Sequence, residues 1–115
     1  MTEKELQTRI AAERAKTKRL IKALLKAGHR LSVIGRFELD YEIENSVDAD
    51  ALLQHATSMD DAVIQTHNGF VLLVFGETAE DLICDYSMDL EKIVNEVEAV
   101  KVYNGVDALN RLYKS

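Results

Sequence analysis

A run of alternating acidic and apolar residues at positions 37–44 is the strongest candidate for chemistry in this sequence. Alternate side chains of a β-strand point to the same face, so four carboxylates would form one row with a spacing of about 7 Å. Phosphates along one strand of a nucleic acid follow one another at a similar spacing, so the row could imitate a nucleic-acid backbone. The pattern therefore indicates a surface for a basic protein partner. The acids of the row are Glu38, Asp40, Glu42 and Glu44, and the apolar residues are Phe37, Leu39, Tyr41 and Ile43.

The same row has a simpler interpretation as the solvated face of an ordinary strand. Like charges on an exposed strand also discourage pairing with another sheet edge. A purely structural face would be expected to mix positive and negative residues, however, because adjacent like charges destabilise a sheet. Both interpretations stay open, and other acids extend the patch if they lie beside it. These acids are Asp48, Asp50, Asp60, Asp61, Glu77, Glu80, Asp81 and Asp85.

A cluster of positive residues precedes the acidic row. Between Arg14 and Arg36 the chain has eight Lys or Arg residues and no acid. Several of the lysines recur at intervals of four residues, which places like charges together on one face of a helix. This arrangement needs a negative partner, and we consider three: the protein's own acidic body, the body of a second subunit, or nucleic acid. The candidate basic face consists of Lys18, Arg19, Lys22 and Lys26.

The composition of this basic helix excludes some classes of partner. It has no interleaved aromatic residues or glycines and more Lys than Arg, so we do not expect it to read bases. Its opposite face has no Trp or Phe that could insert into a membrane surface, so membrane binding is not expected. Neutralisation within the chain or across a homodimer is the main expectation, and binding to a nucleic-acid backbone is the alternative.

Charge is divided sharply along the chain, whose net charge is −6. Residues 1–30 carry nine Lys or Arg and three acids, a net charge of +6. The other 85 residues carry five Lys or Arg and 17 acids, a net charge of −12. Such asymmetry indicates a charged partner or mutual neutralisation. At 115 residues we predict one domain, with residues 1–28 as a basic helical arm and residues 29–115 as an acidic body.

Residue types that commonly support catalysis or metal binding do not form a recognisable pattern. Cys84 is the only cysteine and alternates with apolar residues in a predicted strand, so we expect a buried, inert thiol. The three histidines have no partners at the spacing of metal ligands. Paired acids at 48/50 and 60/61 are more typical of helix caps and turns than of a Mg²⁺ site. We therefore predict a protein that is not an enzyme and needs no metal or cofactor.

One long helix is predicted at residues 3–28. Thr2 is the expected N-cap, and Gly28 is expected just past the C-terminal end. The apolar stripe of this helix is dense only at residues 20–25. We therefore expect its second half to pack, and its first half to project or to meet another subunit.

The remaining elements predict an α+β fold: a long N-terminal helix and an antiparallel meander of about five strands with helices on one face. The pairs Gly35-Arg36 and Asn68-Gly69 are expected to form hairpin turns. The segment at 70–75 is apolar on both faces, which is typical of a central strand. Strands are predicted near 31–33, 37–44, 62–67, 70–75, 82–86 and 100–103, and further helices at 48–58, 89–99 and 106–114.

Four motifs lie within residues 47–91: Val-Asp-Ala-Asp-Ala-Leu-Leu, Ser-Met-Asp-Asp, Gly-Phe-Val-Leu-Leu-Val-Phe-Gly and Glu-Asp-Leu-Ile-Cys-Asp-Tyr-Ser. This segment resembles a loosely defined group of small acidic proteins encoded by bacteriophages and prophages. The resemblance implies a protein that works by binding a host protein. Host defence complexes are among the targets of such proteins. It carries over no catalytic or binding residue.

These observations favour a binding protein of phage or prophage type that docks an acidic face on a basic, nucleic-acid-binding surface of a host protein and blocks it. The alternative is an accessory protein that binds nucleic acid or self-assembles through its basic N-terminal helix. The longest apolar run has six residues, whereas about 20 are needed to span a bilayer. With a single cysteine, the expected location is the reducing cytoplasm of the bacterial host.

Overall fold

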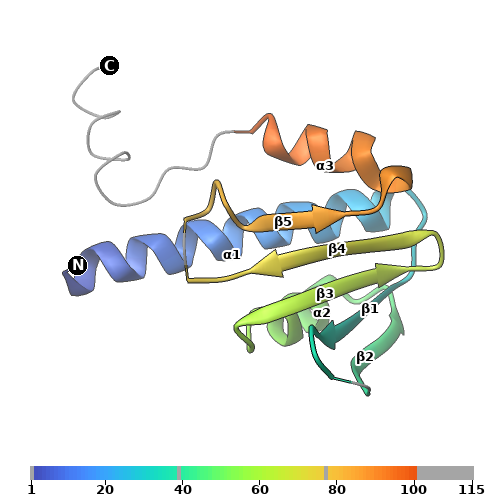
Figure 1. Cartoon of the computed structure of the whole chain (residues 1–115), viewed down its shortest axis with the longest axis horizontal. Helices are drawn as coiled ribbons and strands as arrows, with labels where there is room; N and C mark the ends of the chain where they lie inside the picture. Colours follow the sequence, from blue (N-terminus) through green and yellow to red (C-terminus); the bar gives the residue numbers. More distant parts are fainter. Residues whose placement is uncertain (1, 39, 77, 101–115) are drawn as a thin grey trace.

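A five-stranded sheet and the helices that cover it make up the part of the chain that the computed structural model describes, which is residues 2–38, 40–76 and 78–100 (Figure 1). All neighbouring strands are antiparallel, in the order β2-β1-β3-β4-β5. The predicted α+β class is therefore confirmed, whereas the elements predicted within residues 101–115 lie outside the described residues. The elements are α1 (Glu3–Lys26), β1 (Leu31–Gly35), β2 (Tyr41–Ser46), α2 (Ala49–Ala56), β3 (Asp61–Thr66), β4 (Gly69–Val74), β5 (Ile83–Tyr86), the 3₁₀ turn η1 (Met88–Leu90) and α3 (Glu91–Glu98).

Both ends of α1 have the caps that the sequence predicts. The Thr2 hydroxyl accepts a hydrogen bond from the backbone N–H of Glu5 at 3.2 Å, which satisfies one free donor of the first turn. At the other end Gly28 has a φ of 94°, and the N–H groups of Gly28 and His29 donate to carbonyls of the last turn. These bonds form a Schellman motif, which favours glycine because its φ is positive.

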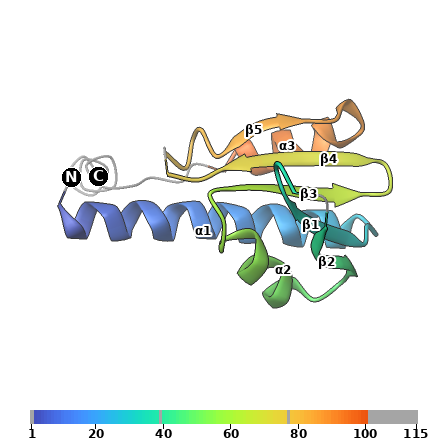
Figure 2. The ribbon, with the colours of Figure 1, turned by 60° about the horizontal axis from the view of Figure 1, so that its bottom comes forward.

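The second half of α1 packs on the sheet, and its first turns extend beyond it (Figure 2). Leu20, Ile21 and Leu24 are fully buried. Near the N-terminus, Leu6 and Ile10 are 38% and 51% exposed. The division predicted from the density of the apolar stripe is therefore confirmed.

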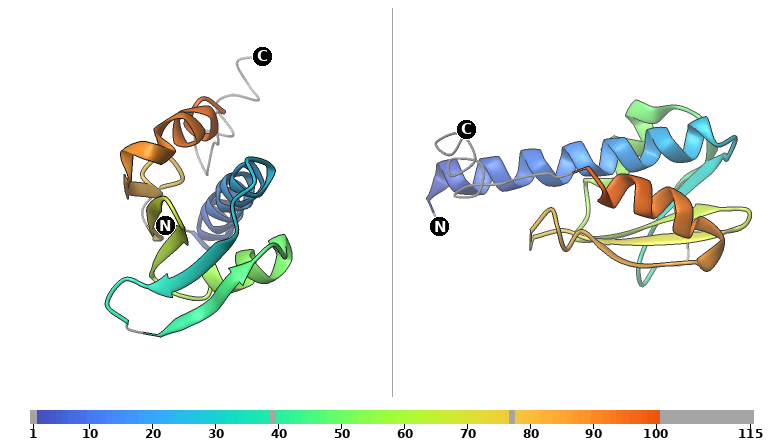
Figure 3. Two further views of the ribbon diagram at one scale, coloured as in Figure 1. Left: turned by 90° about the vertical axis from the view of Figure 1, so that its right-hand side faces the viewer. Right: turned by 90° about the horizontal axis from the view of Figure 1, so that it is seen from above.

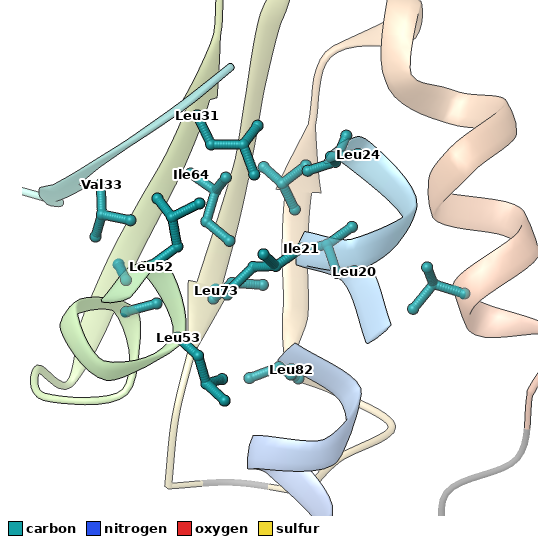
Figure 4. Packing of buried hydrophobic residues seen from close by; sticks show 14 of the residues in the cluster. Leu20, Ile21, Leu24, Leu31, Val33, Leu52, Leu53, Ile64, Leu73 and Leu82 are labelled. Atoms are coloured by element: carbon teal, nitrogen blue, oxygen red, sulfur yellow. The ribbon is translucent and has the colours of Figure 1, made fainter. Parts of the chain in front are cut away.

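All three helices lie on one side of the sheet, with α1 between α2 and α3 (Figure 3). Alternate residues of β1, β3 and β4 point to these helices and are fully buried, as period-2 patterning requires. Figure 4 shows how side chains from the sheet meet those of α1 and α2. The core includes Leu20, Ile21, Leu24, Leu31, Val33, Leu52, Leu53, Ala62, Ile64, Val71, Leu73, Leu82, Leu90, Val94 and Val97.

The strand order departs from a simple meander at one connection. Strand β1 pairs with both β2 and β3, so the chain passes from β2 through α2 to β3 across the intervening strand. The pairing of β3, β4 and β5 does follow sequence order. The crossover brings the end of α2 beside the β1–β2 connection, which matters for the acidic residues described below.

The face of the sheet opposite the helices has an apolar row and no covering helix among the described residues (Figure 3). Ile34 pairs with Val63 across β1 and β3, and Val63 pairs with Leu72 across β3 and β4. Leu72 is 8% exposed, and the other two side chains are partly exposed. The interior position predicted for residues 70–75 is thus confirmed, but helices cover only one face of β4.

The turn of the β3–β4 hairpin lies one residue before its predicted position. Thr66 pairs with Gly69, so the two-residue loop is His67-Asn68 rather than Asn68-Gly69. Gly69 is instead required for a close approach, because a Cβ at this position would lie 2.6 Å from the Ser87 side chain. The sequence pair therefore predicts the hairpin correctly and the position of its turn wrongly, by one residue.

Two charged side chains of α1 are buried against the β4–β5 connection. Glu13 and Lys16 are each 3% exposed. The Glu13 carboxylate accepts a hydrogen bond from the Gly76 N–H at 2.9 Å. The Lys16 Nζ donates to the Ala79 carbonyl at 2.7 Å and lies 2.8 Å from a carboxylate oxygen of Glu98 on α3. These contacts join α1, the β4–β5 connection and α3.

We predict that Lys16→Ala lowers the free energy of unfolding by about 1–3 kcal/mol, because it leaves a buried carbonyl without its donor. The matched control is Lys18→Ala, since Lys18 is exposed on the same helix, and its effect should stay within about 0.5 kcal/mol. Urea denaturation measures both. Equal losses in the two variants would show that the buried contacts of Lys16 do not stabilise the fold.

Candidate functional site

The predicted row of four carboxylates is divided by the way the chain folds. Strand β2 begins at Tyr41, so Glu38 and Asp40 lie in the β1–β2 connection and not in a strand. The strand boundary at residue 37 was therefore wrong. The cause is a turn in which the Glu38 N–H donates to the Gly35 carbonyl at 3.0 Å. Only Glu42 and Glu44 remain in β2.

Strand β2 is irregular, and this separates its two acids. The pairing with β1 shifts twice, since Leu31 pairs with Ser46, Val33 with Ile43, and Ile34 with Tyr41. Each shift places an extra residue in β2, and Asn45 has a positive φ of 51°. An extra residue interrupts the two-residue alternation of side chains. A carboxylate oxygen of Glu42 lies 3.9 Å from Nδ1 of His55 in α2. Glu44, in contrast, lines a different hollow.

Glu38 and Glu42 meet two further acids, Asp60 and Asp61, around one hollow of about 540 Å³. We call these four residues the acidic patch. The Arg36 guanidinium lies 3.3 Å from a carboxylate oxygen of Asp61. Among the described residues, Glu38 and Asp60 have no ion-pair partner, and both are exposed. The patch therefore presents at least two uncompensated carboxylates to a partner.

An exposed aromatic side chain lies within the same hollow. Phe37 is 86% exposed, and the Arg36 guanidinium carbon lies 5.2 Å from its ring centroid. The sequence predicts Phe37 as the first residue of a strand, which is wrong because this residue belongs to the β1–β2 connection. Aromatic side chains, phenylalanine among them, are enriched at protein–protein interfaces.

Of the other acids that the sequence offered as extensions of the patch, Glu77 lies outside the described residues, and Asp48 and Asp81 lie elsewhere and bind local groups. The Asp48 carboxylate accepts hydrogen bonds from the N–H groups of Asp50 and Ala51, so it is the N-cap of α2. Asp81 accepts from the Thr78 hydroxyl at 2.9 Å within the β4–β5 connection. These acids stabilise local structure, as caps and turns do.

The predicted basic face lies along the outside of α1. Lys18, Lys22 and Lys26 are exposed. Arg19 is partly buried, and among the described residues its Nη1 has no hydrogen-bond partner. No ion pair within the described residues includes any of the four. The cations that do pair are others: Arg9, Lys16, Arg36 and, when protonated, His55.

A second, polar hollow of about 520 Å³ lies where α1 leads into β1. Arg30, Tyr41, Glu44, Gln65 and His67 are among the residues that line it. The Tyr41 hydroxyl donates to the Gln65 side-chain carbonyl, and the His67 ring lies 5.7 Å from the ring of a second histidine, His29. Among the described residues, no three His, Cys, Asp or Glu side chains gather as a metal site would require.

Cys84 is exposed, so the prediction of a buried thiol is wrong. In the pairing of β4 with β5, Leu72 pairs with Asp85 and Leu73 with Ile83. Cys84 is therefore the extra residue of an irregular edge strand, and the assumed alternation does not hold there. Neighbouring Ile83 and Tyr86 supply the contacts of β5 with the core.

No known protein family, curated protein or solved structure matches this chain. None of the helices that the structure describes is long and apolar enough to cross a membrane.

We predict that the Cys84 thiol reacts fully with a disulfide reagent in the folded protein, at a rate close to that of the unfolded chain, because it is accessible. The absorbance of the group released from the reagent follows the reaction at low denaturant concentration, and the Cys84→Ser variant gives the background signal. A thiol that reacts only after unfolding would contradict the exposed position of Cys84.

Proposed function

We propose that this chain is a non-enzymatic binding protein of phage or prophage type that docks its acidic patch on a basic, nucleic-acid-binding surface of a host protein and blocks that surface. The observation that carries the proposal is the gathering of Glu38, Glu42, Asp60 and Asp61 around one hollow. The resemblance of residues 47–91 supports the phage context, in which a host defence complex is one class of target. The proposed location is accordingly the cytoplasm of the bacterial host.

The carboxylates of the patch and the neighbouring Phe37 ring would contribute to binding in different ways. The carboxylates of Glu38, Glu42 and Asp60 would attract a cationic partner over a distance set by the Debye length, about 8 Å at physiological salt. Phe37, at the same hollow and 86% exposed, would then bury its ring against the partner. Charge would govern the association rate and its salt dependence, and the ring would contribute short-range affinity.

Residues from two connections contribute to the patch, which makes it a product of the fold. Glu38 follows β1, and Asp60 and Asp61 follow α2 at the start of β3. Pairing of β1 with β3, in which Gly35 is opposite Ala62, brings these segments together. The surface that we propose is therefore a cluster around one hollow, in place of the straight row of carboxylates expected from the sequence.

A triple substitution that neutralises the patch tests the proposal. We predict that Glu38→Gln, Glu42→Gln and Asp60→Asn together weaken binding to the host target about tenfold, since three surface charge pairs contribute about 0.5 kcal/mol each. The target is first isolated with tagged protein from a nuclease-treated host lysate at low salt. Its affinity for the wild type and the variants is then measured with purified components, and so is competition with duplex DNA.

The matched control removes three carboxylates elsewhere: Glu44→Gln, Glu80→Gln and Glu96→Gln. Both variants change the net charge by the same amount, so a difference between them reports position and not total charge. Binding that is equal in the patch variant and the wild type would refute the proposal. Binding that fails to compete with DNA would refute the blocking of a nucleic-acid site.

A further inference from the structure

The outer face of α1 holds a basic strip of lysines, which we define as Lys4, Lys18, Lys22 and Lys26 together with the small, uncharged residues Ala11 and Ala15, which occupy this face between Lys4 and Lys18. All six are exposed. Their intervals of seven, four, three, four and four residues keep them on one side of an α-helix, which has 3.6 residues per turn. The side that faces the sheet holds Leu20, Ile21 and Leu24.

The basic strip has no acid of its own helix to neutralise it. The acids of α1 are Glu3 and Glu5 in the first turn and Glu13, which is buried and bonded to the Gly76 N–H. None of the lysines of the strip forms an ion pair within the described residues. Mutual repulsion at intervals of four residues costs helix stability, which an anionic partner would relieve.

The length of the basic strip favours an extended polyanion. From Lys4 to Lys26 it runs over 22 helical steps, or about 33 Å at 1.5 Å per residue. Three of its four lysines, from Lys18 to Lys26, lie within about 12 Å, and Lys4 lies about 21 Å beyond them. Duplex DNA carries one negative charge per about 1.7 Å of its axis, so it offers phosphates to both positions at once. The acidic patch of a second copy surrounds a single hollow, and its Asp61 is engaged by Arg36, so it could occupy only a small part of the strip.

We infer that the basic strip binds the phosphate backbone of a nucleic-acid duplex without reading its sequence. Lysine ammonium groups are compact point charges that suit phosphate contacts, whereas base readout most often uses the planar guanidinium of arginine. The small side chains of Ala11 and Ala15 allow the nucleic-acid backbone to approach α1 closely between the lysines. The strip is a second binding surface, separate from the acidic patch, because the β1–β2 connection extends away from α1 (Figure 3).

Charge substitution is a better test of this inference than truncation. Removing residues 1–19 would also remove the buried contacts of Glu13 and Lys16, and therefore the attachment of the β4–β5 connection. The strip variant is Lys22→Gln with Lys26→Gln, since glutamine keeps a good helix propensity. The control is Arg30→Gln with Lys92→Gln, which removes two exposed charges outside the strip and one exposed hydrogen bond, from Arg30 Nε to the Asn45 carbonyl. Circular dichroism confirms that each variant is folded.

Fluorescence anisotropy with a labelled DNA duplex of random sequence, about 20 base pairs long, measures binding over a series of salt concentrations. We expect the wild type to bind with a dissociation constant of about 10⁻⁶–10⁻⁴ M at physiological salt, and more tightly at low salt. The strip variant should bind at least tenfold more weakly, and the slope of log affinity against log salt should fall by about two. The control should bind like the wild type, and a second duplex sequence should bind equally well.

Three results would overturn the inference: no binding by the wild type at low salt, equal binding by the strip variant, or equal losses in the strip and control variants. Light scattering without DNA measures the oligomeric state and so tests whether the strip binds a second copy of the chain. Dimers of the wild type that dissociate in the strip variant would assign the strip to self-association instead. The acidic-patch variant should keep its affinity for DNA, so this inference and the proposed function can fail independently.

Discussion

The contacts of buried Lys16 impose the constraint on which the arrangement of this fold depends. Its Nζ lies between the Ala79 carbonyl at 2.7 Å and the Glu98 carboxylate at 2.8 Å, and the side chain is 3% exposed. A charge at such a depth is costly unless it is paired and hydrogen-bonded. Three segments that are distant in the sequence must therefore assemble together. With Lys16 and the apolar residues turned inward, the remaining lysines of α1 must face solvent.

This orientation separates the two kinds of charge in space. The basic strip occupies the outside of the helical layer, and the acidic patch forms where the β1–β2 connection meets the segment after α2. Within the described residues, the ion pairs of α1 use Arg9 and Lys16 and leave the strip unpaired. Within the described residues, the Lys16–Glu98 pair is the one ion pair between α1 and the acidic body, so direct contact cancels little of the charge asymmetry and leaves the basic strip and the acidic patch charged.

The sequence predictions succeeded in the regular strand β3 and failed in the irregular strands β2 and β5. In β3, where the sequence predicts a strand at 62–67, the burial alternates regularly and Ile64 is fully buried. In β2 and β5 the register shifts, and the predictions for the acidic row and for Cys84 failed there. An extra residue reverses the faces of all side chains beyond it, and a hydrophobic pattern of a few residues does not reveal it.

The sequence by itself determined the α+β class, the long capped helix, the packing of its second half and the division of charge, because periodicity, capping residues and composition act locally. Only the tertiary structure decided that Glu38 and Glu42 join Asp60 and Asp61, that Glu44 lies apart, that Phe37 and Cys84 are exposed, and that Glu13 and Lys16 are buried. The physical reason is that these features depend on strand register and on contacts between residues up to 82 positions apart, such as Lys16 and Glu98. Local patterns do not encode such contacts.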